Sequence, residues 1–331
     1  MLWLRFAVSA TIIIFSAMNL SRNADIIAEK TGLGRAWVGA LLLPMVTSLP
    51  EIVASSQAAL LGNPDISMGN VFGSNMFNIT IIALVDLVQG GGPVLYYVSR
   101  SHILTASIGI LLTGLTCLAI LVGPNIVIPV LGIGVDTLIL ILVFLGGIRL
   151  ITRYQRRNGE AEGGAEPQYN ESSHLRAWLM FLLSGVLIVF AGRQLAISAD
   201  ALSQVTGLGG TFMGSFFVAI TTSLPELVAT VTAARMGAFD MAIGNVLGAN
   251  VMNIFIIGVS DLFYRQGAML RAVSQTSLVA GLLAMTLTGI AIIGLIYRSQ
   301  RSVLRLGFDS IAIVALYILG ALAIFSAAGS L

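Results

Sequence analysis

Thr47-Ser48-Leu49-Pro50-Glu51 occurs a second time in this chain, as Thr222-Ser223-Leu224-Pro225-Glu226, at an offset of 175 residues. Each copy places a carboxylate beside a proline within a long apolar run. An ionised carboxylate is costly in water-poor surroundings, so ionisable residues inside membrane segments usually mark functional sites. The two glutamates, Glu51 and Glu226, therefore predict one shared task.

The composition around these segments is that of an integral membrane protein. Of the 331 residues, 57% are hydrophobic and 10% are charged, whereas soluble domains have about 25% charged residues. A spanning helix needs roughly 20 mainly apolar residues. We predict spans at 2–20, 36–61, 66–88, 102–122, 136–153, 178–195, 211–236, 241–262, 272–297 and 309–329. The first is expected to be a retained helix and not a signal peptide.

The two halves of the chain align at the same offset without a gap over a long stretch. The matches are Asp25 with Asp200, 31–34 with 206–209, Gly39 with Gly214, Gly62 and Asp65 with Gly237 and Asp240, 69–71 with 244–246, Gly73 with Gly248, Asn75 and Asn78 with Asn250 and Asn253, and Asp86 with Asp261. This pattern indicates a duplicated five-helix unit. Because five is odd, the second copy enters the membrane with the opposite orientation, which is an inverted repeat typical of secondary transporters.

The aspartates among these matches are expected at helix ends. We predict helix capping for Asp25, Asp200, Asp65 and Asp240, and an end position for Asp86 and Asp261. Gly134-x-Asp136 and Gly307-x-Asp309, at an offset of 173, are predicted as matched N-caps of the fifth and tenth helices. The predicted boundaries are 1–153 for the first repeat, 154–177 for a polar, Gly-rich linker and 178–331 for the second repeat.

The basic residues predict the orientation. On these spans one side collects Arg22, Lys30, Arg35, Arg100, Arg149, Arg153, Arg156, Arg157, Arg176, Arg235, Arg298, Arg301 and Arg305, and the other only Arg5, Arg193, Arg265 and Arg271. Because positive charge favours the cytoplasmic side, we expect a multi-pass cell-membrane protein with a cytoplasmic linker and both termini extracellular or periplasmic. These charges indicate membrane orientation and not a nucleic-acid surface.

The repeated segment combines hard oxygen donors. A proline inside a helix removes one backbone hydrogen bond, which should free or weaken carbonyls around Val46 and Thr47, and around Thr221 and Thr222. With the carboxylates and hydroxyls, these carbonyls suit calcium, magnesium or sodium and not zinc or copper. The only histidines, His102 and His174, lie at segment ends, and Cys117 is the only cysteine, so we expect no disulfide, no soft-metal site and no cofactor.

The helix after each motif supplies the second half of the predicted pocket. Its segments are 69–78, Gly-Asn-Val-Phe-Gly-Ser-Asn-Met-Phe-Asn, and 244–253, Gly-Asn-Val-Leu-Gly-Ala-Asn-Val-Met-Asn. Ser74 and Asn78 are four residues apart and share one helical face. The Gly-x-x-x-Gly spacing by itself is typical of helix packing.

These residues carry a family resemblance. The paired T-S-L-P-E and G-N-x-x-G-S-N-x-x-N segments resemble the alpha repeats of the sodium/calcium exchanger branch of the cation/calcium antiporter superfamily, over nearly the whole chain. The proton/calcium branch instead usually has a G-N-x-x-E version of the first motif, which this chain lacks.

The resemblance implies which residues hold ions. It implies that Glu51 and Glu226 coordinate calcium at the centre and that Asn78 and Asn253 lie in the middle. Thr47, Ser48, Ser74, Thr222 and Ser223 are implied for the calcium and flanking sodium sites. Two positions depart from the archaeal pattern: Ala249 replaces a sodium-binding Ser, and Asn253 replaces an Asp. We therefore expect fewer sodium ions per calcium, or protons in place of sodium.

The expected function is secondary-active calcium/cation antiport by alternating access, with Na⁺ as the counter-ion and the spans at 2–20 and 178–195 as the moving gate. Proton/calcium exchange is the alternative, and a cation channel is a weaker one. An enzyme is not expected, because the chain has no nucleophile with a base, no paired catalytic aspartates and no H-E-x-x-H motif. Since one chain builds both halves of the site, we expect it to function as a monomer in the lipid bilayer, with Ca²⁺, Na⁺ or H⁺ as its partners.

Overall fold

The computed structural model describes residues 2–124, 126–128, 130, 132–157, 173–205 and 219–329, with side chains left out at 156–157, 196, 199–200, 202–205 and 325–329. The helices are α1 (Leu2–Thr31), α2 (Arg35–Trp37), η1 (Val38–Leu42), α3 (Leu43–Thr47), α4 (Leu49–Leu60), α5 (Pro64–Gln89), α6 (Val94–Tyr97), α7 (His102–Val122), α8 (Val135–Arg157), α9 (His174–Val205), α11 (Leu224–Arg235), α12 (Phe239–Phe263), α13 (Met269–Ala272), α14 (Ser277–Tyr297) and α15 (Phe308–Gly329). The predicted all-α class is therefore confirmed.

Most of the predicted spans correspond to long apolar helices. Among the described residues, seven helices are long and apolar enough to cross a membrane, and the bent pair 35–60 makes an eighth. Helix α15 is a shorter apolar helix over Phe308–Ile324. The span predicted at 211–236 begins outside the described residues. The matched positions 206–209 and Gly214 and most of the linker also lie outside them.

Several predicted span ends were wrong. Helix α1 continues to Thr31 and α9 to Val205, each about ten residues beyond the prediction. Both extensions are more polar than the apolar runs from which the spans were predicted. The ninth span starts at Ser277, because residues 273–276 form a connection after the short helix α13. Helix boundaries therefore follow packing as well as hydropathy.

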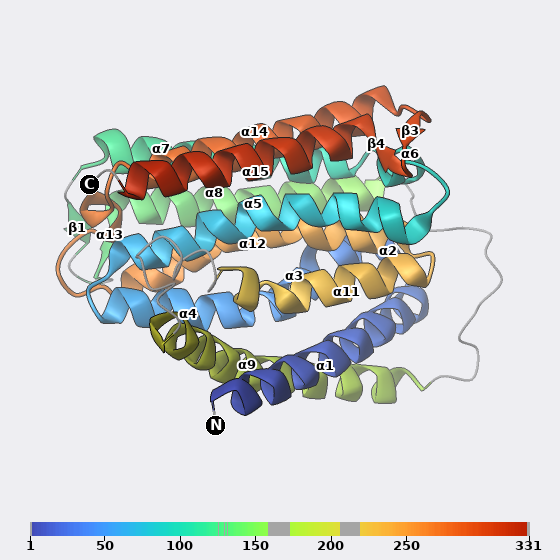
Figure 1. Cartoon of the computed structure of the whole chain (residues 1–331), viewed down its shortest axis with the longest axis horizontal. Helices are drawn as coiled ribbons and strands as arrows, with labels where there is room; N and C mark the ends of the chain where they lie inside the picture. Colours follow the sequence, from blue (N-terminus) through green and yellow to red (C-terminus); the bar gives the residue numbers. More distant parts are fainter. Residues whose placement is uncertain are drawn as a thin grey trace.

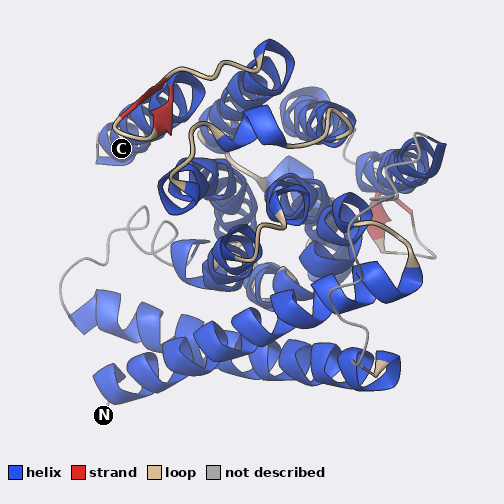
Figure 2. Cartoon of the chain, turned by 90° about the vertical axis from the view of Figure 1, so that its right-hand side faces the viewer, coloured by secondary structure: helices blue, strands red, loops and turns tan. Residues whose placement is uncertain are grey.

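Helices α5 and α12 form the centre of the molecule. In their apolar windows 67% and 89% of the residues are buried, against 33% for α1 and 39% for α9. Figure 1 shows α5 and α12 between the α1–α9 pair on one side and α7, α14 and α15 on the other. Figure 2 shows the long helices α1 and α9 crossing one side of the bundle. The elements that carry most of the motif residues are thus enclosed by the others.

The crossing of α12 with η1 depends on glycines. A Cβ at Gly248 would lie 2.2 Å from the Ala40 carbonyl oxygen, and one at Gly39 would lie 2.5 Å from that of Met241. Such distances are too short for any side chain, so these helices touch through their backbones. The packing role predicted for the Gly-x-x-x-Gly spacing is therefore observed at Gly248.

Each repeat carries a short hairpin before its last helix. Strand β1 (Val127–Ile128) pairs with β2 (Ile133–Gly134), and β3 (Ser302–Val303) pairs with β4 (Leu306–Gly307). Both pairs are antiparallel, with Val127 opposite Gly134 and Ser302 opposite Gly307. The matched hairpins extend the internal repeat beyond its helices.

Asp65 and Asp240 join the two repeats instead of capping their own helices. Both lie in the first turn of α5 or α12, whose N-cap residues form no side-chain cap bond. Asp65 Oδ1 accepts the Ser274 amide at 2.7 Å, and Asp240 Oδ1 accepts the Ser99 amide at 2.7 Å. The capping prediction was wrong for these two residues because each carboxylate bonds an amide that precedes a helix of the other repeat.

Asp86 and Asp261 form a second symmetric pair of junctions, near the other ends of α5 and α12. Asp86 Oδ2 accepts the Gly307 amide at 2.9 Å, and Asp261 Oδ2 accepts the Gly134 amide at 2.7 Å. Their predicted end position is confirmed. The prediction did not include that each reaches the hairpin of the other repeat and ties it to the core.

Asp25 also has a role other than capping. It lies within α1, is almost completely buried, and forms a bidentate ion pair with Arg35, with Nε–Oδ1 at 2.5 Å and Nη2–Oδ2 at 3.2 Å. The capping prediction failed because α1 continues beyond residue 20. The side chain of its match, Asp200, lies outside the described residues.

Candidate functional site

Both copies of the repeated motif interrupt a helix at the same serine. Helix α3 ends at Thr47 and α4 begins at Leu49, and Ser48 between them has φ −84° and ψ 8°. Ser223 has φ −81° and ψ 8° directly before α11. The segments before and after Ser48 differ in direction by 45°. The sequence predicts weakened carbonyls before Pro50 within one span, and the structure shows in addition a break in the helix at Ser48, with the motif hydroxyls and Glu51 buried.

The two repeats exchange hydrogen bonds between these motifs. Ser48 Oγ donates to Glu226 Oε1 at 2.8 Å, and Ser223 Oγ donates to Glu51 Oε1 at 3.0 Å. Glu51 and Glu226 are at most 1% exposed and interact electrostatically with each other. Each repeat therefore orients the carboxylate of the other.

The neighbouring threonines bond to asparagines of α5 and α12. Thr222 Oγ1 donates to Asn70 Oδ1 at 3.1 Å, and Thr47 Oγ1 lies 3.5 Å from Asn245 Oδ1. Asn70 Nδ2 in turn donates to Ser55 Oγ at 2.9 Å. Asn245 Nδ2 donates to the matched hydroxyl of the second repeat, Thr230 Oγ1, at 2.9 Å. These asparagines fix both motif segments to the central helices.

Ser74 brings the face of α5 next to the carboxylates. Its hydroxyl is hydrogen-bonded to that of Ser223 at 2.9 Å, and Ser223 also bonds Glu51. The matched position in α12 is Ala249, which is fully buried and has no hydroxyl. The two halves of the site therefore differ by one side-chain oxygen.

Asn78 and Asn253 are held by a second pair of amides. Asn78 Nδ2 donates to Asn250 Oδ1 at 3.2 Å, and Asn253 Nδ2 donates to Asn75 Oδ1 at 2.8 Å. Asn250 Nδ2 also donates to the Asn75 carbonyl at 3.1 Å. An aspartate has no N–H to donate, so the amide at position 253 is the form that this network requires.

Four oxygens in this network have no donor within the described part of the chain. They are Glu51 Oε2, Glu226 Oε2, Asn78 Oδ1 and Asn253 Oδ1, each buried and without a hydrogen-bond partner. Buried polar atoms are normally paired, and a buried unpaired carboxylate oxygen is especially unfavourable. A cation satisfies such oxygens where no N–H or O–H is present. This set of atoms is the strongest structural indication of an ion site.

All nine predicted site residues are buried and belong to this network: Thr47, Ser48, Glu51, Ser74, Asn78, Thr222, Ser223, Glu226 and Asn253. The predicted set did not include Asn70, Asn75, Asn245 and Asn250, which hold those residues in place. Their recurrence at the 175-residue offset was the available signal. Among the described residues, no three acidic, histidine or cysteine side chains cluster to hold a metal, so amide, hydroxyl and carbonyl oxygens must complete any calcium shell.

Comparison with known proteins identifies the same two segments. The model of the family described as "Sodium/calcium exchanger protein" matches residues 1–152 and 176–326. The inner membrane protein YrbG of Escherichia coli is 27% identical over 256 residues, which cover 76% of each chain. The sodium/calcium exchanger MaX1 of Methanosarcina acetivorans is 44% identical over 84 residues, 25% of this chain and 24% of that one.

The fold is also similar to that of a solved structure. The sodium-calcium exchanger NCX_Mj superimposes with a TM-score of 0.70 over 96% of this chain and 98% of that chain, at 22% sequence identity. This likeness establishes the fold of two inverted five-helix repeats. The residue boundaries predicted for the two repeats and the linker stay predictions.

Asn75→Ala and Asn250→Ala should each weaken calcium binding by about 10- to 100-fold, the usual effect of removing a partner that orients a ligand. Because the two residues are related by the internal repeat, their effects should be similar. Asn63→Ala is the control, since Asn63 is an exposed residue before α5 with no side-chain cap bond. Calcium titration of the purified protein measures the affinities. Wild-type affinity in both variants would show that these amides do not orient the ligands.

Proposed function

The chain belongs to the sodium/calcium exchanger protein family, and from this premise we propose that it exchanges Ca²⁺ for Na⁺ by alternating access around the site described above. Family and fold make it a multi-pass membrane transporter of the cation/calcium antiporter class. The observation that carries the finer proposal is the pair of buried carboxylates, Glu51 and Glu226, whose second oxygens have no donor in the described part of the chain.

Charge and ligand type favour calcium at the centre of this site. Two carboxylates balance one Ca²⁺, and calcium takes six to eight oxygen ligands in flexible geometry. The amide oxygens of Asn78 and Asn253 and the carbonyls around Val46 and Thr221 supply uncharged donors. The proposed ion-binding residues are Thr47, Ser48, Glu51, Ser74, Asn78, Thr222, Ser223, Glu226 and Asn253.

The counter-ion follows from the asymmetry of the site. Ala249 lacks the hydroxyl that Ser74 supplies at the matched position, and Asn253 replaces a third ionisable group, so three sodium ions would exceed the available charge and ligands. We therefore propose fewer than three Na⁺ per Ca²⁺. Proton exchange is the alternative, because two carboxylates that release Ca²⁺ can each accept a proton.

Helices α1 and α9 are the proposed moving gate. They pack along each other (Figure 2), and none of their described side chains belongs to the network of the site. Asn19 Nδ2 donates to Ser184 Oγ at 3.0 Å between them, and Ser21 Oγ donates to the Ala229 carbonyl at 3.0 Å. These few polar contacts are consistent with a pair that moves as a unit against the core.

Two other functions are less consistent with the site. A cation channel would more naturally be a symmetric oligomer, whereas one chain here builds both halves of the site, which supports a functional monomer. An intramembrane enzyme would need a catalytic group of a kind absent from the sequence. Saturable flux that depends on a counter-ion distinguishes the antiporter from a channel.

Glu51→Gln should reduce calcium-45 uptake into proteoliposomes by roughly two to three orders of magnitude, because it removes one of the two negative charges that balance a buried Ca²⁺, and losing one partner of a buried cation–carboxylate pair is strongly unfavourable. Glu29→Gln is the matched control, since Glu29 lies near the end of α1 and outside the site. Its uptake should equal that of the wild type. Retained uptake in Glu51→Gln would overturn the assignment of the site.

The coupling is checked by running wild-type uptake with sodium, proton and null gradients at clamped voltage. We expect sodium-driven uptake that generates less current than three-to-one exchange requires. Ala249→Ser should restore a hydroxyl oxygen to the half of the site that has one fewer, and should lower the sodium concentration for half-maximal exchange severalfold. Three-to-one electrogenic exchange by the wild type would contradict the proposed stoichiometry, and proton-driven uptake without sodium would favour the alternative.

The proposed orientation places the linker in the cytoplasm and both termini outside, as the basic residues indicate. In a Cys117→Ala background, a membrane-impermeant maleimide applied to intact cells should label Val130→Cys but not Arg153→Cys. Both positions are exposed; Val130 lies in the turn before the start of α8, and Arg153 lies near its C-terminal end. Labelling of Arg153→Cys alone would contradict the proposed orientation and indicate the opposite one.

A further inference from the structure

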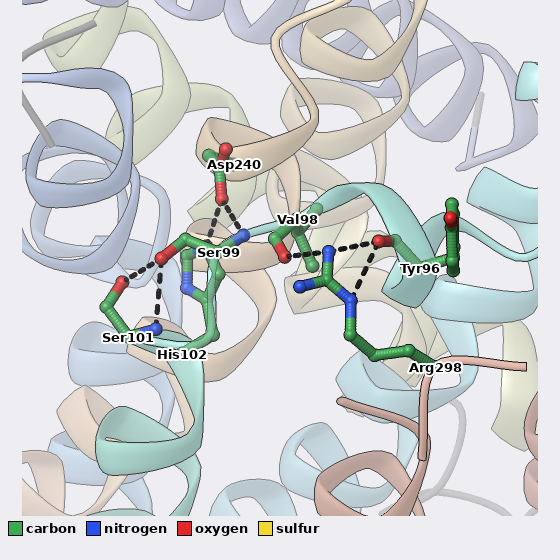
Figure 3. Close-up of polar contacts among 7 residues, drawn as sticks. All are labelled: Tyr96, Val98, Ser99, Ser101, His102, Asp240 and Arg298. Atoms are coloured by element: carbon green, nitrogen blue, oxygen red, sulfur yellow. Dashed lines mark hydrogen bonds and ion pairs between the residues drawn. The ribbon is translucent and has the colours of Figure 1, made fainter. Parts of the chain in front are cut away.

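The symmetric junctions at Asp65 and Asp240 differ in one side chain. Asp65 accepts a hydrogen bond from the Ser274 amide, and Asp240 accepts one from the Ser99 amide. In each case the serine hydroxyl is hydrogen-bonded to the residue directly before the next helix, which is Thr276 for Ser274 and Ser101 for Ser99. At the Asp240 junction, His102 Nε2 also lies 2.9 Å from Asp240 Oδ1 (Figure 3). The residue matched to His102 by the internal repeat is Ser277. One junction thus contains a titratable imidazole that its counterpart lacks.

The Asp240 junction is reinforced further by Arg298. The guanidinium donates to the carbonyls of Tyr96 and Val98 and lies 5.5 Å from the centre of the Tyr96 ring (Figure 3). These carbonyls belong to the same connection as Ser99. The position matched to Arg298 is Gly123, which has no side chain. This junction lies at the end of the bundle where α8 ends and α9 begins (Figure 1).

We propose that His102 is a proton-responsive positioning residue, whose bond to Asp240 tightens on protonation and fixes the start of α12 to the start of α7. The inference concerns the junction itself. Only its effect on transport rests on the proposed function.

The charges around His102 set the direction of the response. Histidine changes charge between pH 5 and 8, and hydrogen bonds between charged groups are roughly twice as strong as neutral ones. The charged groups near His102 are Asp240 and Arg298, with Arg100 exposed in the same connection, and the N-terminus of α7 adds a partial positive charge. His102 Nδ1 has no hydrogen-bond partner in the described part of the chain, so one ring nitrogen is unpaired in either protonation state. The bond should therefore be strongest at low pH and weaken as pH rises.

The junction can reach the ion site through α12. His102 is fully buried, while the Asp240 side chain is 28% exposed and gives protons access. Asp240 lies five residues before Asn245, whose amide is bonded to Thr230 and close to Thr47. A looser start of α12 should therefore disturb the asparagines that frame the carboxylates.

Hydrogen exchange tests this proposal in the intact protein. After correction for intrinsic exchange, protection of the peptide that contains the Ser99 amide should fall about tenfold from pH 6 to pH 8. The peptide that contains Ser274 is the internal control and should not change, because its junction has no histidine. Equal pH dependence of both peptides in the wild type would overturn the proposal without any variant.

Three variants sharpen the test. His102→Ser copies the other junction and should remove the pH dependence at Ser99, and Ser277→His should create it at Ser274. His102→Gln keeps a hydrogen-bond donor without the charge change, so it should retain protection at a level independent of pH. A pH response that persists at Ser99 in both His102 variants would contradict the assigned role.

Transport provides a second measurement. His102→Ser should raise the calcium concentration for half-maximal uptake about threefold at pH 6 and leave it unchanged at pH 8, with the maximal rate kept. The effect should be smaller than that of a direct ligand partner. If no variant transports calcium, the proposed function fails, while the exchange measurements still decide the role of His102. A shift of equal size at both pH values would contradict a proton-responsive role.

Discussion

Two buried carboxylates, each with one oxygen that has no donor in the described part of the chain, are the constraint on which this structure depends. Placing an ionised group in a low-dielectric interior costs several kcal/mol even after relaxation, and the second oxygens of Glu51 and Glu226 have no donor in the described part of the chain. Ser48 and Ser223 bond the first oxygens. A cation bound between the carboxylates, as in the proposed function, would satisfy these oxygens, so the stability of the site should depend on whether one is bound.

The inverted repeat explains how one chain satisfies this constraint. Ser48 orients Glu226 and Ser223 orients Glu51, so neither half holds its own carboxylate. The aspartates at the ends of α5 and α12 follow the same rule, since each binds an amide of the other repeat. Because contacts are exchanged at the centre and at both ends of α5 and α12, the two repeats form one packed unit. The proposed gate needs such a unit, since it must move against a core of fixed geometry.

The sequence was sufficient to predict the helical class, the duplication and nine residues that the structure buries in one hydrogen-bonded network, because most of them belong to segments that occur twice. What it could not predict were contacts between segments far apart in the chain. Asn75 and Asn250 repeat as visibly as Asn78 and Asn253, yet only the packing of α5 on α12 shows which pair supports the other. Asp65 and Asp240 have the local pattern of helix caps, and their partners lie about 140 to 210 residues away.

The differences between the two halves are as informative as their likeness. A duplicated site with identical halves would treat both sides of the membrane alike, apart from the ions present there. Ala249 at the position matched to Ser74 leaves one half of the site with a hydroxyl fewer, and Ser277 at the position matched to His102 makes the helix junctions unequal. The first difference acts on the ions that bind, and the second acts on the frame that holds α12. Because the backbone arrangement is shared by both repeats, these few substitutions are what can make the two sides of the membrane differ for transport.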